Sequence, residues 1–464
     1  MATITKTFQN FIGGEWVDAA SGDTFDSTSP ADGELIGTFP RSGADDVERA
    51  VAAAKEAYED WRLVPAPKRG EILFRFAQLL VEHKEELTEL MTHEMGKVKA
   101  EAGGDVQEAI DMSYYMGGEG RRLFGQTTPS ELRDKFQMSV RMPIGVVGVV
   151  TPWNFPIAIP SWKIAPALVC GDTIVFKPAS DTPALGHRFV ELLDEAGVPK
   201  GVVNIVHGGG GQVGDALVRH PDVPVITLTG SRDTGVEVLR TAADRLKHVH
   251  LELGGKNAII VMEDADLDLA LEGIVWSAFG TSGQRCTAAS RAIVHESVYG
   301  ELEKRLVERA EALALGVGWE DSTDVGPVIN GAALEKIDSY VAIGKDEGAR
   351  LLGRRDRDRG RSREGLLLPA DDLRRRRARH AHRPGGDLRA RALADRSAGR
   401  GRGGARLERH SLRALVLDLH ARREPCVPRD ARPPGRHHVR QRGNDRRGGA
   451  PSLRRSQGDR QRAP

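Results

Sequence analysis

The chain of 464 residues is long enough for two or three domains, and its 67 basic and 66 acidic side chains leave a net charge of only +1. This balance hides two unlike parts, because residues 354–464 hold 33 Arg, no Lys and 13 acidic residues, whereas residues 1–353 hold 34 basic and 53 acidic residues. An acidic body argues against nucleic acid as the partner of residues 1–353.

The cysteines Cys170, Cys286 and Cys426 are too few and too scattered for a disulfide framework or a zinc site, so no metal is expected. The first residues lack the long apolar core of a secretion signal, and no run of 18 apolar residues follows. The sequence therefore predicts a cytoplasmic protein that has no membrane partner.

The first third of the chain is predicted to be mainly helical. Apolar residues recur at helical spacing over 44–61 and again over 67–92, which predicts a helix in each range. Residues 127–145 are polar and favour β-structure, which indicates a protruding hairpin.

From Gly145 onward, short apolar strands alternate with helices, and this pattern is typical of a parallel, doubly wound sheet. Helices are expected to begin at Ile157 and Ala184. The expected strands are 146–150, 173–177, 202–206 and 225–228. The chain contains no internal repeat.

Residues 354–464 contain no Lys, Ile, Met, Thr, Phe, Tyr or Trp. With so few large apolar groups, this tail cannot offset its ordering entropy, so disorder is predicted. The charge alone would favour a basic arm for nucleic acid. Translation out of frame from a GC-rich gene is the interpretation we prefer. Back-translating three tail segments and starting one base later gives AKGYFFRPTIF, IAREEIFGPVLSLI and EVHLPFGGAKATGNG in chain order, with the shift between about Leu352 and Arg363.

Two short segments carry groups suited to covalent catalysis, Leu251–Asn257 (LELGGKN) and Gly283–Thr287 (GQRCT). They place the Glu252 carboxylate and the Cys286 thiol 34 residues apart, each beside small residues that let a ligand approach. Such a thiol can attack a substrate while the acid activates water. A lone cysteine is more commonly a small buried hydrophobe. That packing role is expected for Cys170, and no role is expected for Cys426.

Three further segments lie where a predicted strand ends. Thr151–Pro156 (TPWNFP) follows a strand and precedes a helix, so a helix cap is one role open to the Asn154 amide. Phe176–Ser180 (FKPAS) ends a strand, where open α/β sheets bind ligands. In Leu228–Gly235 (LTGSRDTG), a helix N-terminus suits phosphate binding. The pattern Gly209-x-Gly211-x-x-Gly214 matches the dinucleotide fingerprint, although four consecutive glycines meet it easily.

Together these segments resemble the motifs of the aldehyde dehydrogenase superfamily over residues 8–353, and the three shifted peptides resemble its downstream motifs. The resemblance implies an α/β fold with a doubly wound, parallel-sheet nucleotide-binding domain, an incomplete α/β catalytic domain and a disordered basic tail. It also implies a homodimer or homotetramer for the in-frame protein. The implied parts are the nucleotide-binding domain at 1–126 and 146–253, an oligomerisation hairpin at 127–145, the catalytic domain at 254–353 and the tail at 354–464.

The resemblance also implies a reaction, the oxidation of an aldehyde or semialdehyde to a carboxylic acid. In the family mechanism the thiolate of Cys286 attacks the carbonyl, and the Asn154 amide with the Cys286 backbone N–H holds the oxyanion. Hydride transfer to NAD or NADP converts the thiohemiacetal into a thioester. Glu252 then activates water, and because acyl-CoA-forming members lack this base, a free acid is the expected product.

The implied cofactor residues are Thr151, Pro152, Trp153, Lys177, Ser180, Gly214, Gly230, Ser231, Gly235 and Leu253. In the family the lysine contacts the adenine ribose hydroxyls. NAD-selective members often carry Glu where Ser180 stands, so NADP should be tolerated here. The alternative interpretation is a catalytically inactive, frameshifted product of an aldehyde dehydrogenase gene.

Overall fold

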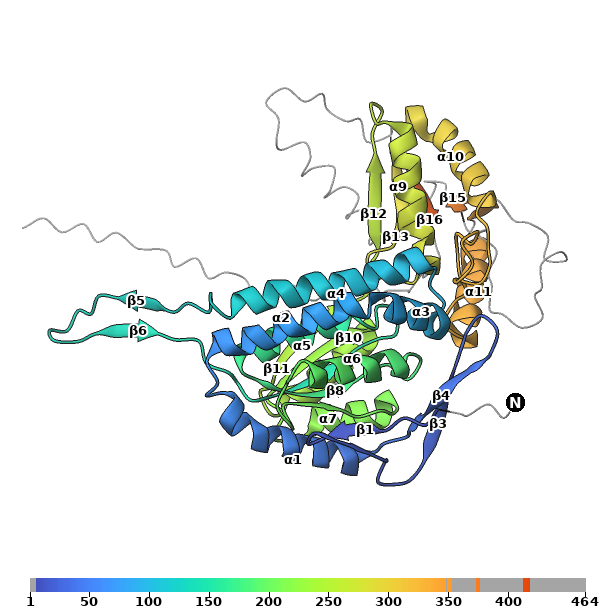
Figure 1. The fold of residues 1–464 in the computed structure, drawn as a ribbon. Coiled ribbons are helices and arrows are strands. Elements are labelled where there is room, and N and C mark those ends of the chain that lie inside the picture. The colour runs from blue at the N-terminus through green and yellow to red at the C-terminus, as the bar shows by residue number, and fades with distance from the viewer. Residues whose placement is uncertain (1–5, 348, 353–372, 376–411, 418–464) are drawn as a thin grey trace, which may run out of the picture. The chain divides into compact units, whose positions relative to one another are not determined.

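A computed structural model describes residues 6–347, 349–352, 373–375 and 412–417 (Figure 1). Within these ranges, no helix combines the length and the apolar character needed to cross a bilayer. Two sheets organise the fold, one of seven strands and one of five, together with two small two-stranded sheets.

The larger sheet confirms the predicted parallel, doubly wound arrangement. Its strands are β1 (Asn10–Ile12), β2 (Glu15–Val17), β7 (Val146–Val150), β8 (Thr173–Lys177), β9 (Val203–Ile205), β10 (Val225–Gly230) and β11 (His248–Leu253). They lie in the order β11-β10-β7-β8-β9-β1-β2. Strands β7 to β11 run parallel, and β1 joins the edge of β9 in the antiparallel sense.

The order of the strands reverses beside β7. Strands β8 and β9 follow on one side of β7, whereas β10 and β11 lie on the other side. Connections that leave β7 and β10 therefore diverge at the carboxyl edge of the sheet, which opens the crevice where doubly wound folds bind ligands. The segments after Val150 and Gly230 stand at this point.

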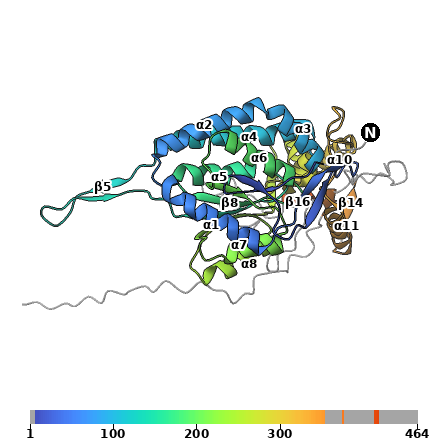
Figure 2. The same cartoon turned by 60° about the horizontal axis from the view of Figure 1, so that its bottom comes forward.

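Helices cover both faces of the sheet (Figures 1 and 2). One face carries α2 (Ala66–Glu82), α4 (Lys99–Glu119), α5 (Ala158–Cys170) and α6 (Pro183–Glu195), with α3 (Lys84–Met95) beside them. The other face carries α1 (Ala44–Trp61), α7 (Asp215–Arg219) and α8 (Arg232–Ala243). Each face buries its own apolar cluster, so the sheet is covered on both sides.

The predicted helix over 67–92 is wrong as a single element. The chain leaves the helical conformation at His83, with φ −99° and ψ 14°, and starts again as α3. Glu85 and Glu86 occupy the first turn of α3, where negative charge favours a helix start, and the His83 ring contacts Glu86 at 2.7 Å. These two acidic residues are the sequence signal for the start of a new helix at Lys84.

The predicted hairpin is confirmed as β5 (Gln126–Thr128) paired with β6 (Gln137–Ser139). All residues of both strands are exposed, and Figure 1 shows the hairpin extending away from the helices. Its part in oligomerisation stays a prediction. A second hairpin, β3 (Thr24–Thr28) with β4 (Leu35–Pro40), precedes α1.

The five-stranded sheet follows the larger one in the chain. Its strands are β12 (Asn257–Val261), β13 (Ala289–His295), β14 (Arg350–Leu352), β15 (Leu373–Arg375) and β16 (Leu412–Leu417), in the order β12-β13-β16-β15-β14. The helices here are α9 (Leu267–Phe279), α10 (Glu296–Glu311) and α11 (Gly331–Asp346). A separate apolar cluster lies under α9 and α10.

Strands β15 and β16 belong to the range 354–464 that the sequence predicts to be a disordered tail. Their backbones pair antiparallel with one another, and β16 pairs with β13. The segment 412–417 (LRALVL) is the most apolar part of the tail, and apolar residues favour pairing with an open sheet edge. The remaining residues of that range, including the shifted peptides and Cys426, lie outside the described residues.

Candidate active site

Four predicted site segments meet at the carboxyl edge of the larger sheet. The Thr151 segment follows β7, Lys177 ends β8, Gly230 ends β10, and Glu252 lies near the end of β11. Glu252 pairs in register with Thr229 of β10, and the backbone N–H of Thr151 donates to the Lys177 carbonyl at 3.3 Å. The parallel sheet therefore gathers residues that are far apart in the chain.

Cys286 lies just after a strained turn. The 3₁₀ turn η2 (Gly280–Gly283) follows α9, and Thr281 and Ser282 within it have left-handed φ angles of 52° and 54°. Left-handed conformations are costly for residues other than glycine, so surrounding contacts have to hold the turn. Cys286 itself is exposed.

Three hydrogen bonds anchor this turn from inside the protein. The Ser282 hydroxyl donates to the Gly326 carbonyl at 2.7 Å. The buried side chain of Gln284 accepts from the Ile329 N–H at 3.0 Å and donates to the Thr281 carbonyl at 3.3 Å. Polar side chains of the turn thus anchor it to the backbone at Gly326 and Ile329, directly before Cys286.

Asn154 joins the segment after β7 to this turn. Its Nδ2 donates to the Gln284 carbonyl at 3.0 Å, and its buried Oδ1 has no hydrogen-bond partner among the described residues. The helix-cap interpretation of Asn154 is wrong, because α5 begins at Ala158 with Ile157 in the cap position. A carboxamide nitrogen carries two protons, so one N–H of Asn154 is left for a substrate oxygen.

A buried ion pair holds the chain just beyond Asn154. The Asp105 carboxylate accepts from Lys97 at 2.6 Å and from the Ala158 N–H at 2.7 Å. Both side chains of the ion pair are fully buried. The Lys97 ammonium also lies 3.8 Å from the centre of the Phe155 ring. Burial lowers the pKa of Lys97 and raises the pKa of Asp105, and their mutual attraction opposes both shifts.

Glu252 and Cys286 are connected through the segment that carries the acid. Glu252 is exposed on β11, and five residues later the Asn257 amide donates to the Cys286 carbonyl at 2.8 Å and to the Ala288 carbonyl at 3.2 Å. The motif LELGGKN contains Asn257, but the sequence alone does not indicate a role for this residue. The sequence signal for such a role is a polar residue at the first position of an otherwise apolar strand.

Lys163 is a second residue that the sequence interpretation missed. It lies on the otherwise apolar α5, and its buried ammonium donates to the Thr227 hydroxyl at 2.9 Å. Burial lowers the pKa of Lys163 to about 8, while the charge of Glu252 acts to raise it. A cation therefore acts electrostatically on the predicted base. The sequence signal for a special role is that Lys163 is the only charged residue of α5.

Lys177 and Ser180 stand together at the end of β8. Burial lowers the pKa of Lys177 to about 8, with the charge of Asp181 opposing the shift. Within the described ranges, the Lys177 ammonium has no hydrogen-bond acceptor. Ser180 donates to the Gly208 carbonyl at 2.9 Å, and Asp181 accepts from Asn330 at 2.8 Å. A buried ammonium that needs acceptors fits the hydroxyl or phosphate oxygens of a nucleotide.

The glycine-containing segments differ in what surrounds them. In the π-helical turn η1 (Gly210–Gly214), a Cβ added at Gly210, Gly211 or Gly214 would meet no described atom within 4 Å, so ligand atoms have room there. Gly235 is instead tightly packed, because an added Cβ would lie 2.8 Å from the Leu253 side chain. The structure thus brings Gly235 and Leu253 into direct contact.

Ser231 caps the helix that faces the crevice. Its Oγ accepts from the Thr234 N–H at 3.2 Å, so Ser231 is the cap and α8 starts at Arg232. The unpaired N–H groups of a first helical turn attract phosphate oxygens. Thr151 is buried, whereas Trp153 is half-buried against the main core and Pro152 is also half-buried. The end of β10 and the start of α8 therefore provide groups that suit the phosphates of a dinucleotide.

Cys170 has the packing environment that the sequence predicts. It is the last residue of α5, half-buried against the main apolar cluster, and burial raises the pKa of its thiol. Across the part of the chain that the structure describes, no group of three His, Cys, Asp or Glu side chains could hold a metal ion.

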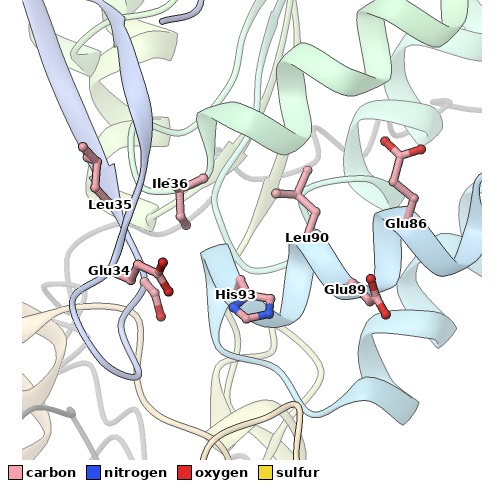
Figure 3. Close-up of a pocket in the computed structure, with 8 residues that line it drawn as sticks. Glu34, Leu35, Ile36, Glu86, Glu89, Leu90 and His93 are labelled. Carbon is pink, nitrogen blue, oxygen red and sulfur yellow. The ribbon is translucent and has the colours of Figure 1, made fainter. Parts of the chain in front are cut away.

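A cavity of about 330 Å³ lies apart from these residues (Figure 3). Glu34, Leu35 and Ile36 line one side, and helix α3 supplies the other, with Glu86, Glu89, Leu90 and His93. Glu86 is paired with Arg188, and His93 stacks on Trp319. None of the lining residues belongs to the predicted site, so the chemistry is assigned to the sheet edge instead.

Comparison with known proteins agrees with this site. The sequence model of the aldehyde dehydrogenase family matches residues 16–370. An α-ketoglutaric semialdehyde dehydrogenase of Bacillus subtilis (strain 168) is 42% identical over 355 residues, which cover 76% of this chain and 73% of that protein. The NADP(+) succinate-semialdehyde dehydrogenase GabD of Escherichia coli (strain K12) is 40% identical over 353 residues, covering 76% and 73%.

A solved structure gives the same result. The crystal structure of betaine aldehyde dehydrogenase from Staphylococcus aureus in complex with NAD+ superposes with a TM-score of 0.76 at 36% identity, over 78% of this chain and 72% of that one. The chain therefore belongs to the aldehyde dehydrogenase family and is an NAD(P)-dependent oxidoreductase that converts an aldehyde into a carboxylic acid.

Proposed function

We propose that Cys286 is the nucleophile of this reaction, with Asn154 as the oxyanion donor and Glu252 as the base. The observation that carries the proposal is the hydrogen bond from Asn154 to the Gln284 carbonyl at 3.0 Å. It holds an amide N–H beside the turn that bears the thiol. A nucleophile and an oxyanion donor must be close together for acyl transfer.

In the first step, the Cys286 thiolate forms a bond to the carbonyl carbon of the aldehyde, and the carbonyl oxygen becomes an alkoxide. The second N–H of Asn154 and the backbone N–H of Cys286 donate to this oxygen. Bound NAD(P) supplies the acceptor for the hydride that leaves the same carbon. The carbon–oxygen double bond then re-forms, and the acyl group remains on sulfur as a thioester.

Glu252 serves the second step. Its carboxylate takes a proton from water, the hydroxide adds to the thioester carbon, and the Cys286 thiolate leaves as the free acid forms. The ammonium of Lys163 acts electrostatically on this carboxylate. Because a base is present for hydrolysis, the product is the acid and not an acyl-CoA.

The nucleotide is held at the same edge of the sheet. Lys177 would bind ribose oxygens, the start of α8 at Gly230 and Ser231 would receive the diphosphate, and the open space beside Gly214 would accommodate the adenine end. Thr151, Pro152 and Trp153 line the segment beside the nicotinamide. Gly235 and Leu253 keep α8 packed on β11, and Ser180 leaves the 2′ position without an opposing carboxylate.

The substrate is a semialdehyde, an aldehyde that also bears a carboxylate. The names of the relatives from Bacillus subtilis and Escherichia coli support this class. The protein acts in the cytoplasm as a homodimer or homotetramer, assembled through the hairpin at 127–145. The nucleotide-binding parts are 1–126 and 146–253, and the catalytic part is 254–353.

We also infer that the gene is read out of frame after about residue 353. Support comes from the shifted peptides; the family match ends at residue 370, and the match to the Bacillus subtilis relative covers 73% of that protein. The alternative of a catalytically inactive product is tested by comparing the two reading frames.

The nucleophile is tested by trapping the acyl-enzyme. The frame-corrected chain is mixed with NAD(P) and succinate semialdehyde, quenched in acid and digested, and the peptide that contains Cys286 is weighed. We expect acylation on that peptide, none in Cys286→Ser, and an unchanged result in Cys170→Ser. Acylation elsewhere, or turnover by Cys286→Ser above a few per cent, would refute the assignment.

A further inference from the structure

Glu101 lies in the first turn of α4, and its carboxylate binds the turn that leads to Cys286. One oxygen accepts from the Thr281 N–H at 2.6 Å and from the Thr281 hydroxyl at 3.0 Å. The other oxygen accepts from the Arg285 guanidinium at 2.7 Å. These bonds cross 180 or more residues of sequence, so they connect the nucleotide-binding part with the nucleophile segment.

The bonds fall on the strained part of the turn. Thr281 has a left-handed φ of 52°, a conformation that a β-branched residue adopts at a cost. Glu101 satisfies both the backbone N–H and the hydroxyl of this residue. A carboxylate that accepts two hydrogen bonds from one strained residue offsets the cost of the strain, because such charge-assisted bonds are stronger than neutral ones.

Arg285 completes the arrangement on the other side. It directly precedes Cys286, its Nε donates to the Thr281 hydroxyl at 2.9 Å, and its guanidinium lies 4.4 Å from the centre of the Trp276 ring. Its side chain is only 8% exposed and that of Glu101 15%, so solvent competes weakly with the pair. The arginine is thereby committed to the turn and is not available to a substrate carboxylate.

Gly280 makes room for the pair. A Cβ at this position would lie 2.8 Å from the Glu101 carboxylate and 2.8 Å from the Arg285 guanidinium. A side chain at this position would therefore displace the two charged groups, although the φ angle of −55° is one that other residues adopt. The glycine is an independent sign that the turn is built around these two charges.

We propose that Glu101 is a positioning residue for the reaction, acting through Thr281 and Arg285 to hold Cys286 in its attacking geometry. The inference rests on the proposed role of Cys286 as nucleophile. Glu101 touches neither the substrate nor the cofactor. A misplacement of about 1 Å at the reacting atom can cost on the order of 100-fold in rate, so the clamp affects chemistry more than binding.

The experiment compares Glu101→Ala, Glu101→Gln and the matched control Asp111→Asn, which removes an exposed carboxylate of the same helix. Three quantities are measured in the frame-corrected, full-length chain: the rate constant of the NAD(P)H burst, the Kd of NAD(P), and amide hydrogen exchange over residues 277–290. In Glu101→Ala we expect the burst to slow roughly 10- to 100-fold and exchange at 277–290 to accelerate, with the Kd within about twofold. Glu101→Gln keeps one acceptor oxygen and should recover part of both effects.

Gly280→Ala provides a second variant, in which Glu101 is intact but displaced, and it should reproduce the slow burst. A burst and exchange pattern like the wild type in Glu101→Ala or in Gly280→Ala would overturn the inference. So would a Kd that rises by the same factor as the burst slows, because that result describes general damage. If Cys286→Ser keeps its burst, the proposed function itself fails, whereas a burst lost in Cys286→Ser and kept in Glu101→Ala removes only this inference.

Discussion

The Nδ2 atom of Asn154 lies 3.0 Å from the carbonyl oxygen of Gln284, two residues before the proposed nucleophile. Asn154→Ala removes both the donor to the oxyanion and this link. We expect kcat to fall about 10²- to 10³-fold, the usual loss for one oxyanion-hole donor, with the Kd of NAD(P) little changed. Steady-state kinetics and cofactor titration check this prediction. A kcat within a factor of three of the wild type would remove Asn154 from the site.

Glu252→Gln should separate the two halves of the reaction. The variant keeps the nucleophile and the oxyanion donors, so NAD(P)H should still form in a single burst, but water lacks its base and the thioester should persist. Stopped-flow absorbance measures the burst, and the intact mass of the quenched protein detects the acyl-enzyme. Normal release of acid after the burst would show that another group acts as the base.

Ser180→Glu should penalise NADP selectively. The new carboxylate would stand near the 2′-phosphate, and a like charge there should cost roughly 1–3 kcal/mol in kcat/KM for NADP, with NAD affected much less. Ser180→Ala is the matched control, because it loses only the hydrogen bond to the Gly208 carbonyl. Equal losses with both cofactors in Ser180→Glu would exclude position 180 as a selectivity determinant.

The affinity for NADP relative to that for NAD should fall as the pH rises through 8. Burial lowers the pKa of Lys177 to about 8, so the ammonium that attracts the 2′-phosphate is charged below that pH and neutral above it. The pKa of Lys163 is also about 8, but its ammonium donates to the Thr227 hydroxyl and does not lie at the end of β8. The ratio of the two Kd values therefore isolates Lys177. A ratio that is constant from pH 7 to 9, or that still changes in Lys177→Met, would contradict the assignment.

A one-base correction between codons 352 and 363 should restore the hidden EEIFGPV and PFGG peptides. We expect the corrected chain to gain turnover and to assemble as a defined oligomer, because its catalytic sheet then receives its own strands and its exposed edges are covered. Both chains are compared with a panel of aliphatic aldehydes and semialdehydes, and by light scattering. Equal NAD(P)H production by both would show that the arginine-rich tail is a working part of the enzyme.

The sequence was most informative where one kind of residue dominates a segment. Strands 146–150 and 173–177 were predicted to the residue, since a strand buried on both faces is a continuous apolar run. The helix break at His83 was missed, because the apolar stripe continues across it and only the acidic first turn of α3 marks the new start. Strand β11 (HVHLEL) was not predicted, because histidines and a glutamate alternate with its half-buried residues.

The residues of the candidate site also differ in how far the sequence alone predicts them. Asn154, Glu252 and Cys286 lie in short motifs, and the residue types in these motifs indicate the chemistry that is proposed for them. Glu101 and Lys163 do not, because their importance arises from contacts made across the fold, such as the bond from Thr281 to a carboxylate 180 positions away. A glutamate on the surface pattern of a helix carries no local sign that it will meet a strained turn.

Helix α4 holds both halves of the site within a single turn, Glu101 on the side of the thiol and Asp105 on the side of the oxyanion donor. A rigid shift of this helix carries both groups together, so their separation changes only if the backbone bends between them. Gly103 and Gly104 occupy that interval, and glycine is the residue that lets a helix bend most easily. The spacing between the contacts that Glu101 and Asp105 make is therefore governed by the stiffness of one helical turn, and engineering that spacing would begin at Gly104, where an added methyl group would meet no described atom within 4 Å.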